Sequence, residues 1–320
     1  MCTAISFDGY FGRTLDYEFS FGQQVVITPR YYPLPMRCLS EMDNHYAIIG
    51  TARVEDGYPL YFDACNEKGL AMAGLNFPGN AHYFECRKNR DNVASFELIP
   101  WILGQCSNVK QAVNLMQTIN LVNISFSKEL PLSPLHWMIG DKDKSVVVEC
   151  VRDGLHIYDN PIGVLTNNPP FEMQLFHLSN YMGLHSGEAV DRMGYDLKLH
   201  SRGMGAFGLP GDLSSPSRFV RAAFTRSNAT VGKTDSCRVH QFFHILATVS
   251  MTEGCVRLET GNEKTIYTSC CDLSCGIYYY TTYDNCRITA VALKEESLNE
   301  KKLICFPFRD GGDIFCEKIL

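Results

Sequence analysis

The sequence predicts an α+β fold in which two antiparallel sheets are sandwiched between helices. Segments with strand patterning stand towards both ends of the 320-residue chain, segments with helical spacing lie between them, and no β–α–β alternation occurs. There is no Pro/Ser/Gly-rich linker, no abrupt change of charge and no internal repeat. We therefore expect a single domain over residues 1–320.

The N-terminal segment predicts a β-hairpin. Cys2–Phe7 alternates and is rich in β-forming residues, Asp8-Gly9 is a strong signal for a two-residue turn, and the return strand begins at Tyr10. Similar patterning predicts further strands at residues 24–29, in two stretches of 58–75 around the turn at 66–69, and at 136–140, 145–151, 154–158, 265–270, 276–282 and 288–293.

Helical spacing of apolar residues appears in four segments. One covers residues 96–106, and a second covers 109–119 after Ser107, the candidate N-cap. Residues 171–181 and 239–249 show the same periodicity. These helices are expected to cover the outer faces of the sheets.

Composition argues against several classes of protein. The net charge is −6 and the basic residues are scattered, which is unlike the basic surface of a nucleic-acid binder. No apolar run is long enough to span a bilayer, and the first nine residues do not have the pattern of a secretory signal. We therefore expect a cytoplasmic protein without a membrane partner, in which most of the 14 cysteines are buried small hydrophobic residues.

A glycine motif imitates a dinucleotide site. Gly203, Gly205 and Gly208 have the GxGxxG spacing, but that fingerprint needs a strand before it, a helix after it and an acidic residue about twenty positions on. Here the motif runs into Leu209-Pro210, and Asn228 occupies the place of the acid. A glycine-rich loop is the better interpretation.

A histidine pair imitates a zinc site. His240 and His244 are spaced i, i+4 on a predicted helix, but Gln241 replaces the glutamate of a zinc protease motif. Core or surface histidines are expected, and neither a metal nor an organic cofactor is predicted.

Cys2 carries the strongest chemical signal. Cytoplasmic processing removes Met1 when the second residue is small, so the mature chain would begin with a thiol and a free α-amine on one residue. The amine titrates near pH ~7.7–8.0 and is partly neutral in the cell, so it can accept the proton of its own thiol. The resulting thiolate is the reactive nucleophile of an amidase. A cysteine at position 2 is by itself no proof of catalysis.

The predicted hairpin places a cation beside this thiol. A two-residue turn pairs Ala4 with Arg13 and Cys2 with Leu15, so Cys2 and Arg13 share a face as diagonal neighbours, roughly 7–8 Å apart at the backbone. Asp16 falls just beyond Leu15 and can hold the new terminal ammonium, provided that the strand bends or ends there. A surface salt bridge between Arg13 and Asp16 is the alternative at this point.

Several motifs follow one another along nearly the whole chain. They are MCT (1–3), FGRTLDYEFSFGQQVVITPR (11–30), NEKGLAMAGLNFPG (66–79), LPLSPLHW (130–137), GVLTNNP (163–169), GLPGDLSSPSRFVR (208–221) and GIYYYTTYDN (276–285). In this order they resemble the choloylglycine hydrolase family, and within it the bile salt hydrolases.

The resemblance implies an αββα N-terminal-nucleophile fold, assembly as a homotetramer, and hydrolysis of the amide bond of conjugated bile acids without a cofactor. It implies that Cys2 is the nucleophile and that a polar cluster surrounds it: Arg13, Asp16, Asn76, Asn167 and Arg218. Asn76 and Asn167 would form the oxyanion hole. The residues implied to contact the substrate are Leu15, Phe21, Asn76, Phe126 and Leu130.

Simpler roles remain for some of these residues. Asn76 and Asn167 stand next to prolines or turns and can shape the backbone, and Arg218 can be a structural ion-pair partner.

Thr14 stands where relatives often carry Asn. Strand alternation points its side chain away from Cys2, so little effect on the chemistry is expected.

Three other functions stay open. They are a penicillin V acylase-type amidase, transfer of the bile acyl group to an amine, and a catalytically silent bile-acid-binding protein. The irregular segment 180–212 is a candidate inter-subunit arm.

Overall fold

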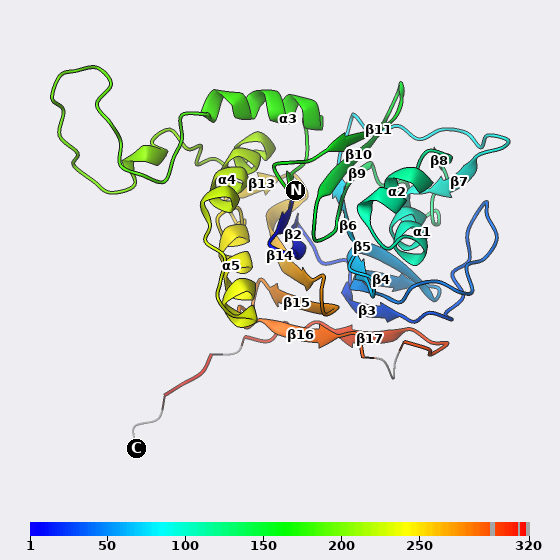
Figure 1. The fold of residues 1–320 in the computed structure, drawn as a ribbon. Coiled ribbons are helices and arrows are strands. Elements are labelled where there is room, and N and C mark those ends of the chain that lie inside the picture. Colours follow the sequence, from blue (N-terminus) through cyan, green and yellow to red (C-terminus); the bar gives the residue numbers. More distant parts are fainter. Residues whose placement is uncertain (295–297, 313, 318–320) are drawn as a thin grey trace.

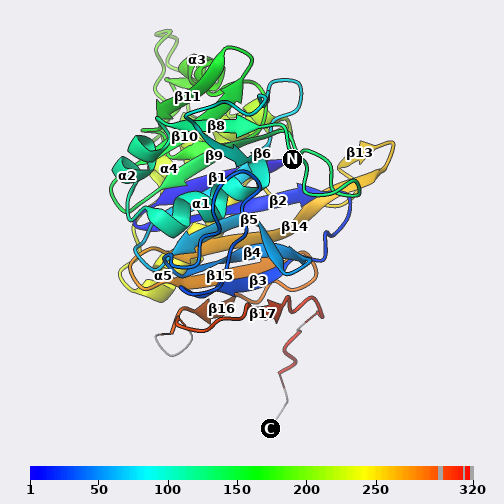
Figure 2. The ribbon, with the colours of Figure 1, turned by 90° about the vertical axis from the view of Figure 1, so that its right-hand side faces the viewer.

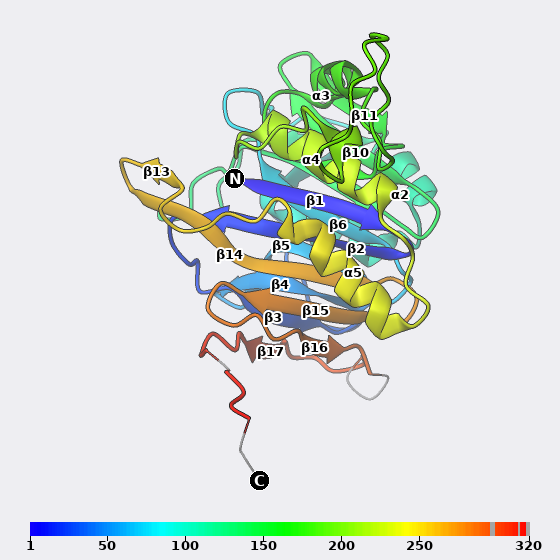
Figure 3. The ribbon, with the colours of Figure 1, turned by 90° about the vertical axis from the view of Figure 1, so that its left-hand side faces the viewer.

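The computed structural model describes residues 1–294, 298–312 and 314–317. Two antiparallel sheets lie face to face with helices on both outer sides (Figure 1), which is the predicted αββα arrangement. Helices α1 and α2 cover the second sheet (Figure 2), and α4 and α5 cover the first sheet (Figure 3).

The first sheet is built around the N-terminal hairpin of β1 (Cys2–Phe7) and β2 (Tyr10–Tyr17). Asp8 and Gly9 both have positive φ, 50° and 78°, as a type I′ turn requires. The other strands of this sheet are β12 (Val164–Leu165) beside β1, then β14 (Gly261–Asp272), β15 (Ile277–Thr282) and β16 (Thr289–Ala292) beyond β2, with β13 (Val256–Leu258) paired to β14.

The hairpin register is the predicted one. Cys2 lies opposite Leu15, Ala4 opposite Arg13, and Phe7 opposite Tyr10. The local turn chemistry therefore placed Arg13 correctly with respect to Cys2.

The second sheet contains the strands predicted in the middle of the chain. In spatial order they are β11 (Gly154–Asp159), β10 (Ser145–Val151), β9 (Leu135–Gly140), β6 (Ala71–Asn76), β5 (Tyr58–Asn66), β4 (Ile48–Glu55), β3 (Gln24–Thr28) and β17 (Ile304–Pro307). A parallel pair, β7 (Asp91–Ala94) and β8 (Ile119–Val122), lies apart from both sheets.

Helices η1 (Ser95–Glu97), α1 (Leu98–Gln105) and α2 (Val109–Leu115) confirm the first two helical predictions in outline. The predicted N-cap and the predicted end of α2 were wrong. Asn108, not Ser107, caps α2 by accepting a hydrogen bond from the Gln111 N–H at 3.0 Å. The helix ends at Leu115, because the following residues enter β8.

The remaining helices belong to the side of the first sheet. Helices α3 (Phe171–Leu178) and η2 (Ser179–Tyr181) match the third prediction, and α5 (Asp235–Ala247) contains most of the fourth. Helix α4 (Ser215–Asn228) was not predicted, although it packs on β1. None of the helices that the structure describes is long and apolar enough to cross a membrane.

The cysteines depart from the expectation that most are buried small hydrophobic residues. Cys65 in β5 and Cys271 in β14 form a disulfide that joins the two sheets. Eight free cysteines are exposed: Cys38, Cys86, Cys237, Cys255, Cys275, Cys286, Cys305 and Cys316. Many of them lie in connecting segments, which run over the surface and leave their side chains uncovered.

The segment between η2 and α4 extends away from the body of the protein (Figure 1). Apart from η3 (Met204–Ala206) it has no regular structure, as predicted for residues 180–212. The Gly203–Gly208 motif lies here without a preceding strand, so the glycine-rich loop interpretation is confirmed. His240 and His244 lie on the exposed side of α5.

Candidate active site

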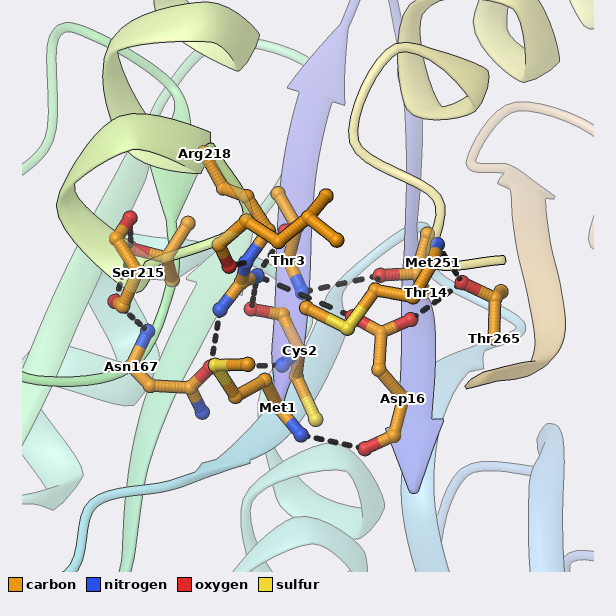
Figure 4. Close-up of polar contacts among 12 residues, drawn as sticks. Met1, Cys2, Thr3, Thr14, Asp16, Asn167, Ser215, Arg218, Met251 and Thr265 are labelled. Carbon is orange, nitrogen blue, oxygen red and sulfur yellow. Dashed lines mark hydrogen bonds and ion pairs between the residues drawn. The ribbon is translucent and has the colours of Figure 1, made fainter. Parts of the chain in front are cut away.

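Cys2 begins β1 at the point where the first sheet meets α4. Its side chain is buried. Its backbone N–H donates a hydrogen bond to Oδ1 of Asn167 at 2.7 Å. In Figure 4 the sulfur of Cys2 points to the side on which the Met1 amine lies.

The Met1 amine marks the place where a charged terminus is held. It donates to the carbonyl of Asp16 at 2.6 Å and contacts the carboxylate of Glu263. The Asp16 N–H donates in return to the Met1 carbonyl at 2.8 Å, so residue 16 faces residue 1 as the sequence suggested. Burial lowers the pKa of this ammonium, although Cys2 and Asp16 act in the opposite direction.

Arg13 lies fully buried on the face of β2 that meets the second sheet. Its Nη1 donates to the carbonyls of Phe62 at 3.2 Å and Gly74 at 2.5 Å. The Nη2 atom is buried and has no hydrogen-bond partner among the described residues. Burial by itself lowers the pKa of Arg13, but the nearby Cys2 leads several groups that raise it above its ordinary value. A cation in this position stabilises a thiolate.

Asp16 lies on the opposite face of β2, because side chains alternate along a strand. Its carboxylate accepts hydrogen bonds from the hydroxyls of Thr265 at 2.6 Å and Thr14 at 3.2 Å. Nη1 of Arg218 is 3.9 Å from Oδ2 of Asp16. All of these side chains are buried. The polar cluster therefore occupies both faces of the hairpin.

Thr14 has a contact that the sequence argument missed. Alternation does turn its side chain to the face opposite Arg13, but that is the face on which Asp16 lies. The Thr14 hydroxyl accepts from the Thr3 N–H at 3.2 Å and donates to Asp16. Thr14 is thus a neighbour of the site.

Arg218 links α4 to the start of β1. It sits in the first turn of the helix, where Pro216 follows Ser215 at the N-terminus. Its Nη1 donates to the Cys2 carbonyl and to the Thr3 hydroxyl, both at 2.6 Å, and its Nη2 donates to Oδ1 of Asn167 at 2.8 Å (Figure 4). Burial lowers the pKa of Arg218, and Asp16 opposes this effect.

Asn167 has more partners than a turn residue needs. Its Nδ2 donates to the carbonyl of Asn76 at 2.7 Å, and its backbone N–H donates to the hydroxyl of Ser215 at 2.8 Å. Asn76 ends β6 and is half-buried. The second sheet and α4 therefore both contribute to the surroundings of Cys2.

The apolar residues expected to contact substrate fall into separate groups. Leu15 is buried opposite Cys2. Phe21 packs against Tyr17 with ring centroids 4.7 Å apart and against Phe62 at 5.5 Å, and the carbonyl of Phe62 contacts Arg13. Tyr17 and Phe62 had not been singled out. An aromatic residue type does not by itself predict that these two side chains lie beside Phe21.

Phe126 belongs to a second aromatic cluster. Its ring lies 5.9 Å from that of Tyr58 and 5.2 Å from that of Phe96. Leu130 is half-buried in the same connecting segment. The structure thus brings the five polar residues together around Cys2 and leaves the four apolar residues in separate groups.

Comparisons with known proteins place this arrangement in a family. The model of the linear amide C–N hydrolases, choloylglycine hydrolase family, matches residues 2–306. A bile salt hydrolase/transferase from Lactiplantibacillus plantarum is 53% identical over 98% of this chain and 99% of its own length. A conjugated bile acid hydrolase from Lactobacillus gasseri is 37% identical over 96% and 100%.

Solved structures agree with this result. The C2A mutant of the conjugated bile acid hydrolase from Clostridium perfringens superimposes with a TM-score of 0.93 at 34% identity, covering 99% of this chain and 100% of that one. Penicillin V acylase from Agrobacterium tumefaciens has a TM-score of 0.75 at 16% identity, covering 95% of this chain and 90% of that one, which shows the shared fold. With a family match over most of its length, this chain belongs to the choloylglycine hydrolase family of linear amide C–N hydrolases.

Proposed function

We propose that this chain hydrolyses the amide bond of glycine- or taurine-conjugated bile acids, with Cys2 as the nucleophile once Met1 has been removed. The observation that carries the proposal is the environment of the Cys2 nitrogen. Asn167 accepts its hydrogen, Arg218 holds the Cys2 carbonyl, and Arg13 lies on the face of the thiol. The names of the relatives supply the substrate class.

In the first half of the reaction the neutral α-amine of Cys2 takes the proton of the thiol. The thiolate attacks the carbonyl carbon of the amide, and the carbonyl oxygen becomes an oxyanion that Asn76 and Asn167 stabilise. A donor of this kind is typically worth ~2.7–4 kcal/mol. The ammonium then protonates the nitrogen of glycine or taurine, the C–N bond breaks, and a bile acyl thioester remains on Cys2.

In the second half water replaces the amino acid. The amine takes a proton from water, the hydroxide attacks the thioester carbon, and the C–S bond breaks to release the bile acid. The sulfur recovers its proton from the ammonium, so the enzyme returns to its starting state. Arg13, Asp16 and Arg218 supply fixed charges near Cys2 and keep its backbone in position. Each is buried, and each makes a hydrogen bond to a residue of the N-terminal hairpin.

The test is a set of parallel assays on taurocholate, glycocholate and penicillin V. Wild type is expected to cleave the bile acid conjugates, and Cys2→Ala is expected to cleave none. Mass spectrometry of the purified protein should show that Met1 is absent. Preferential cleavage of penicillin V, or full activity with Met1 retained, would reject the proposal.

Acyl transfer is a second candidate activity, favoured by the printed name of the 53% identical relative, which includes transferase. The same thioester would accept an amine in place of water, forming a new amide and freeing the thiol. Adding hydroxylamine during taurocholate turnover should yield the bile acyl hydroxamate. Formation of free cholate alone, at every hydroxylamine concentration, would argue against transfer.

We also propose that the chain assembles as a homotetramer through the arm at residues 180–212. Large apolar side chains are exposed there: Met182 is 83% exposed, Met193 76%, Tyr195 75% and Phe207 89%. The His185 N–H donates to the Gly205 carbonyl at 3.1 Å, so residues 187–203 can be replaced by a short turn. Light scattering should then show smaller assemblies; an unchanged mass would exclude this role.

We propose a cytoplasmic location because the proposed reaction needs the free amine of Cys2. Removal of Met1 in the cytoplasm would expose that amine. Cell fractionation would test it, and recovery of the protein outside the cytoplasm would contradict it.

A further inference from the structure

Two exposed cysteines from distant parts of the sequence meet on the surface. Cys38 lies between β3 and β4, and Cys86 lies between β6 and β7. Their sulfur atoms are 3.6 Å apart. Neither residue belongs to the cluster around Cys2, and the proposed hydrolysis does not use them.

We propose that Cys38 and Cys86 are a redox modification site, at which they form a reversible disulfide on reaction with a low-molecular-weight disulfide such as oxidised glutathione. A disulfide has an S–S length of about 2.05 Å, so the two sulfurs must approach by roughly 1.5 Å. Two exposed side chains in the segments that connect strands can make that movement. Exposure also lets the oxidant reach either sulfur.

The chemistry is thiol–disulfide exchange in two steps. The thiolate of one cysteine attacks a sulfur of the oxidant, forming a mixed disulfide and releasing one molecule of thiol. The thiolate of the second cysteine then attacks the protein sulfur of the mixed disulfide, so that the Cys38–Cys86 bond forms and the second molecule of thiol leaves. Two electrons pass from the cysteine pair to the oxidant, and the two thiol protons end on the released thiols.

The Cys38 side of the pair is anchored. The N–H of the preceding residue, Arg37, donates to the buried carboxylate of Glu97 at 2.6 Å. The Arg37 guanidinium lies over the rings of Phe96 and Phe126, at 5.6 and 5.2 Å, and donates to the Phe126 carbonyl at 2.9 Å. Cys38 is therefore held in place without the disulfide.

The Cys86 side is anchored by its other neighbours. The Phe84 N–H donates to the Leu121 carbonyl at 2.8 Å, and the carboxylate of Glu85 accepts from Nδ2 of Asn123 at 2.8 Å. With both ends fixed, little conformational entropy is lost when the sulfurs join, which favours ring closure over a stable mixed disulfide. The bond would tie together the two segments that contact residues 121–126.

The test uses the full-length protein, treated with oxidised glutathione, alkylated with N-ethylmaleimide and digested with trypsin without reduction. Cleavage after Arg37, Arg53, Lys68 and Arg87 gives peptides 38–53 and 69–87, each with a single cysteine. The expected product is these two peptides cross-linked, with a mass two hydrogens below their sum. Dithiothreitol should separate them.

Variants make the result decisive. Cys38→Ser should accumulate a glutathione mixed disulfide on Cys86, because no second thiol is present to displace it. Cys237→Ser removes another exposed cysteine, on α5, and should leave the cross-link unchanged. Alkylation or separate glutathionylation of Cys38 and Cys86 in the wild type, without the cross-linked peptide, would overturn the proposal.

Discussion

Oδ1 of Asn167 accepts a hydrogen bond from the backbone nitrogen of Cys2 at 2.7 Å. This nitrogen becomes the terminal amine after Met1 is removed, so Asn167 orients the group that we propose as the base. The same side chain also carries an Nδ2 donor, which contacts the carbonyl of Asn76. Asn167 thus connects the proposed nucleophile to the proposed oxyanion site.

Replacing Asn167 with Ala should lower kcat by about 10²–10³, the effect of losing one oxyanion donor. The matched control is Asn168→Ala. The Asn168 side chain donates to the Pro78 carbonyl at 2.8 Å and accepts from Nδ2 of Asn80 at 3.1 Å. Steady-state kinetics with taurocholate and thermal unfolding of both variants would be compared. Equal loss of kcat in the two variants would indicate a role of the loop rather than of the Asn167 side chain.

Replacing Arg13 with Gln should slow the reaction of the Cys2 thiol with iodoacetamide, because a cation that stabilises the thiolate is removed. Loss of an opposite charge at close range should lower the alkylation rate at neutral pH by roughly tenfold or more. Arg13→Lys keeps the charge and should lose less of the rate. An unchanged alkylation rate in a folded Arg13→Gln variant would show that Arg13 does not act on the thiol.

The acid limb of kcat/KM should lie below the ordinary titration range of an α-amine, about pH 7.7–8.0. Burial lowers the pKa of the Met1 ammonium. Cys2, whose nitrogen would become the terminal amine, is buried as well, so we expect the same direction there, and the reaction needs the neutral amine. Activity should consequently persist as the pH falls through the ordinary range and decline only at the lower pKa. A pH series with taurocholate checks this, and a limb at or above pH ~8 would contradict it.

Replacing Thr14 with Val should destabilise the fold and slow the reaction, since Asp16 loses a hydroxyl donor while the side chain keeps its shape. A hydrogen bond to a charged group contributes about 1.5–3 kcal/mol. Urea unfolding should show a loss of this size, and kcat should fall with it. Thr14→Ser retains the hydroxyl and should recover most of both. If Val is tolerated with no change in either measurement, the contact with Asp16 has no energetic role.

The N-terminal hairpin could be derived from the sequence because its determinants are local. Asp8-Gly9 supplies the positive φ values of a two-residue turn, and the turn sets every pair along β1 and β2. The nearness of Arg13 to Cys2, and of Asp16 to the chain terminus, follows from counting residues. The order of strand and helix patterns indicated two antiparallel sheets between helices, and the resemblance to the family implied the αββα fold.

The rest of the site depends on contacts between distant segments. Asn167 and Arg218 are separated by 51 positions in the chain and lie far from Cys2, and they meet because α4 packs on β1. The spacing of apolar residues along the chain does not predict that α4 packs on β1. Asn167 and Arg218 were therefore identified through family motifs, and α4 itself was not predicted. The exposure of the cysteines and the contact of Thr14 with Asp16 were misjudged for the same reason.

What the sequence determined by itself was therefore the hairpin that carries Cys2 and Arg13, since a tight turn specifies the register of the two strands it joins. Only the tertiary structure decided which side chains close around that hairpin, which cysteines reach the surface, and that Cys38 meets Cys86. These depend on how two sheets and their helices pack, an outcome of the whole chain's burial of apolar surface rather than of any one segment.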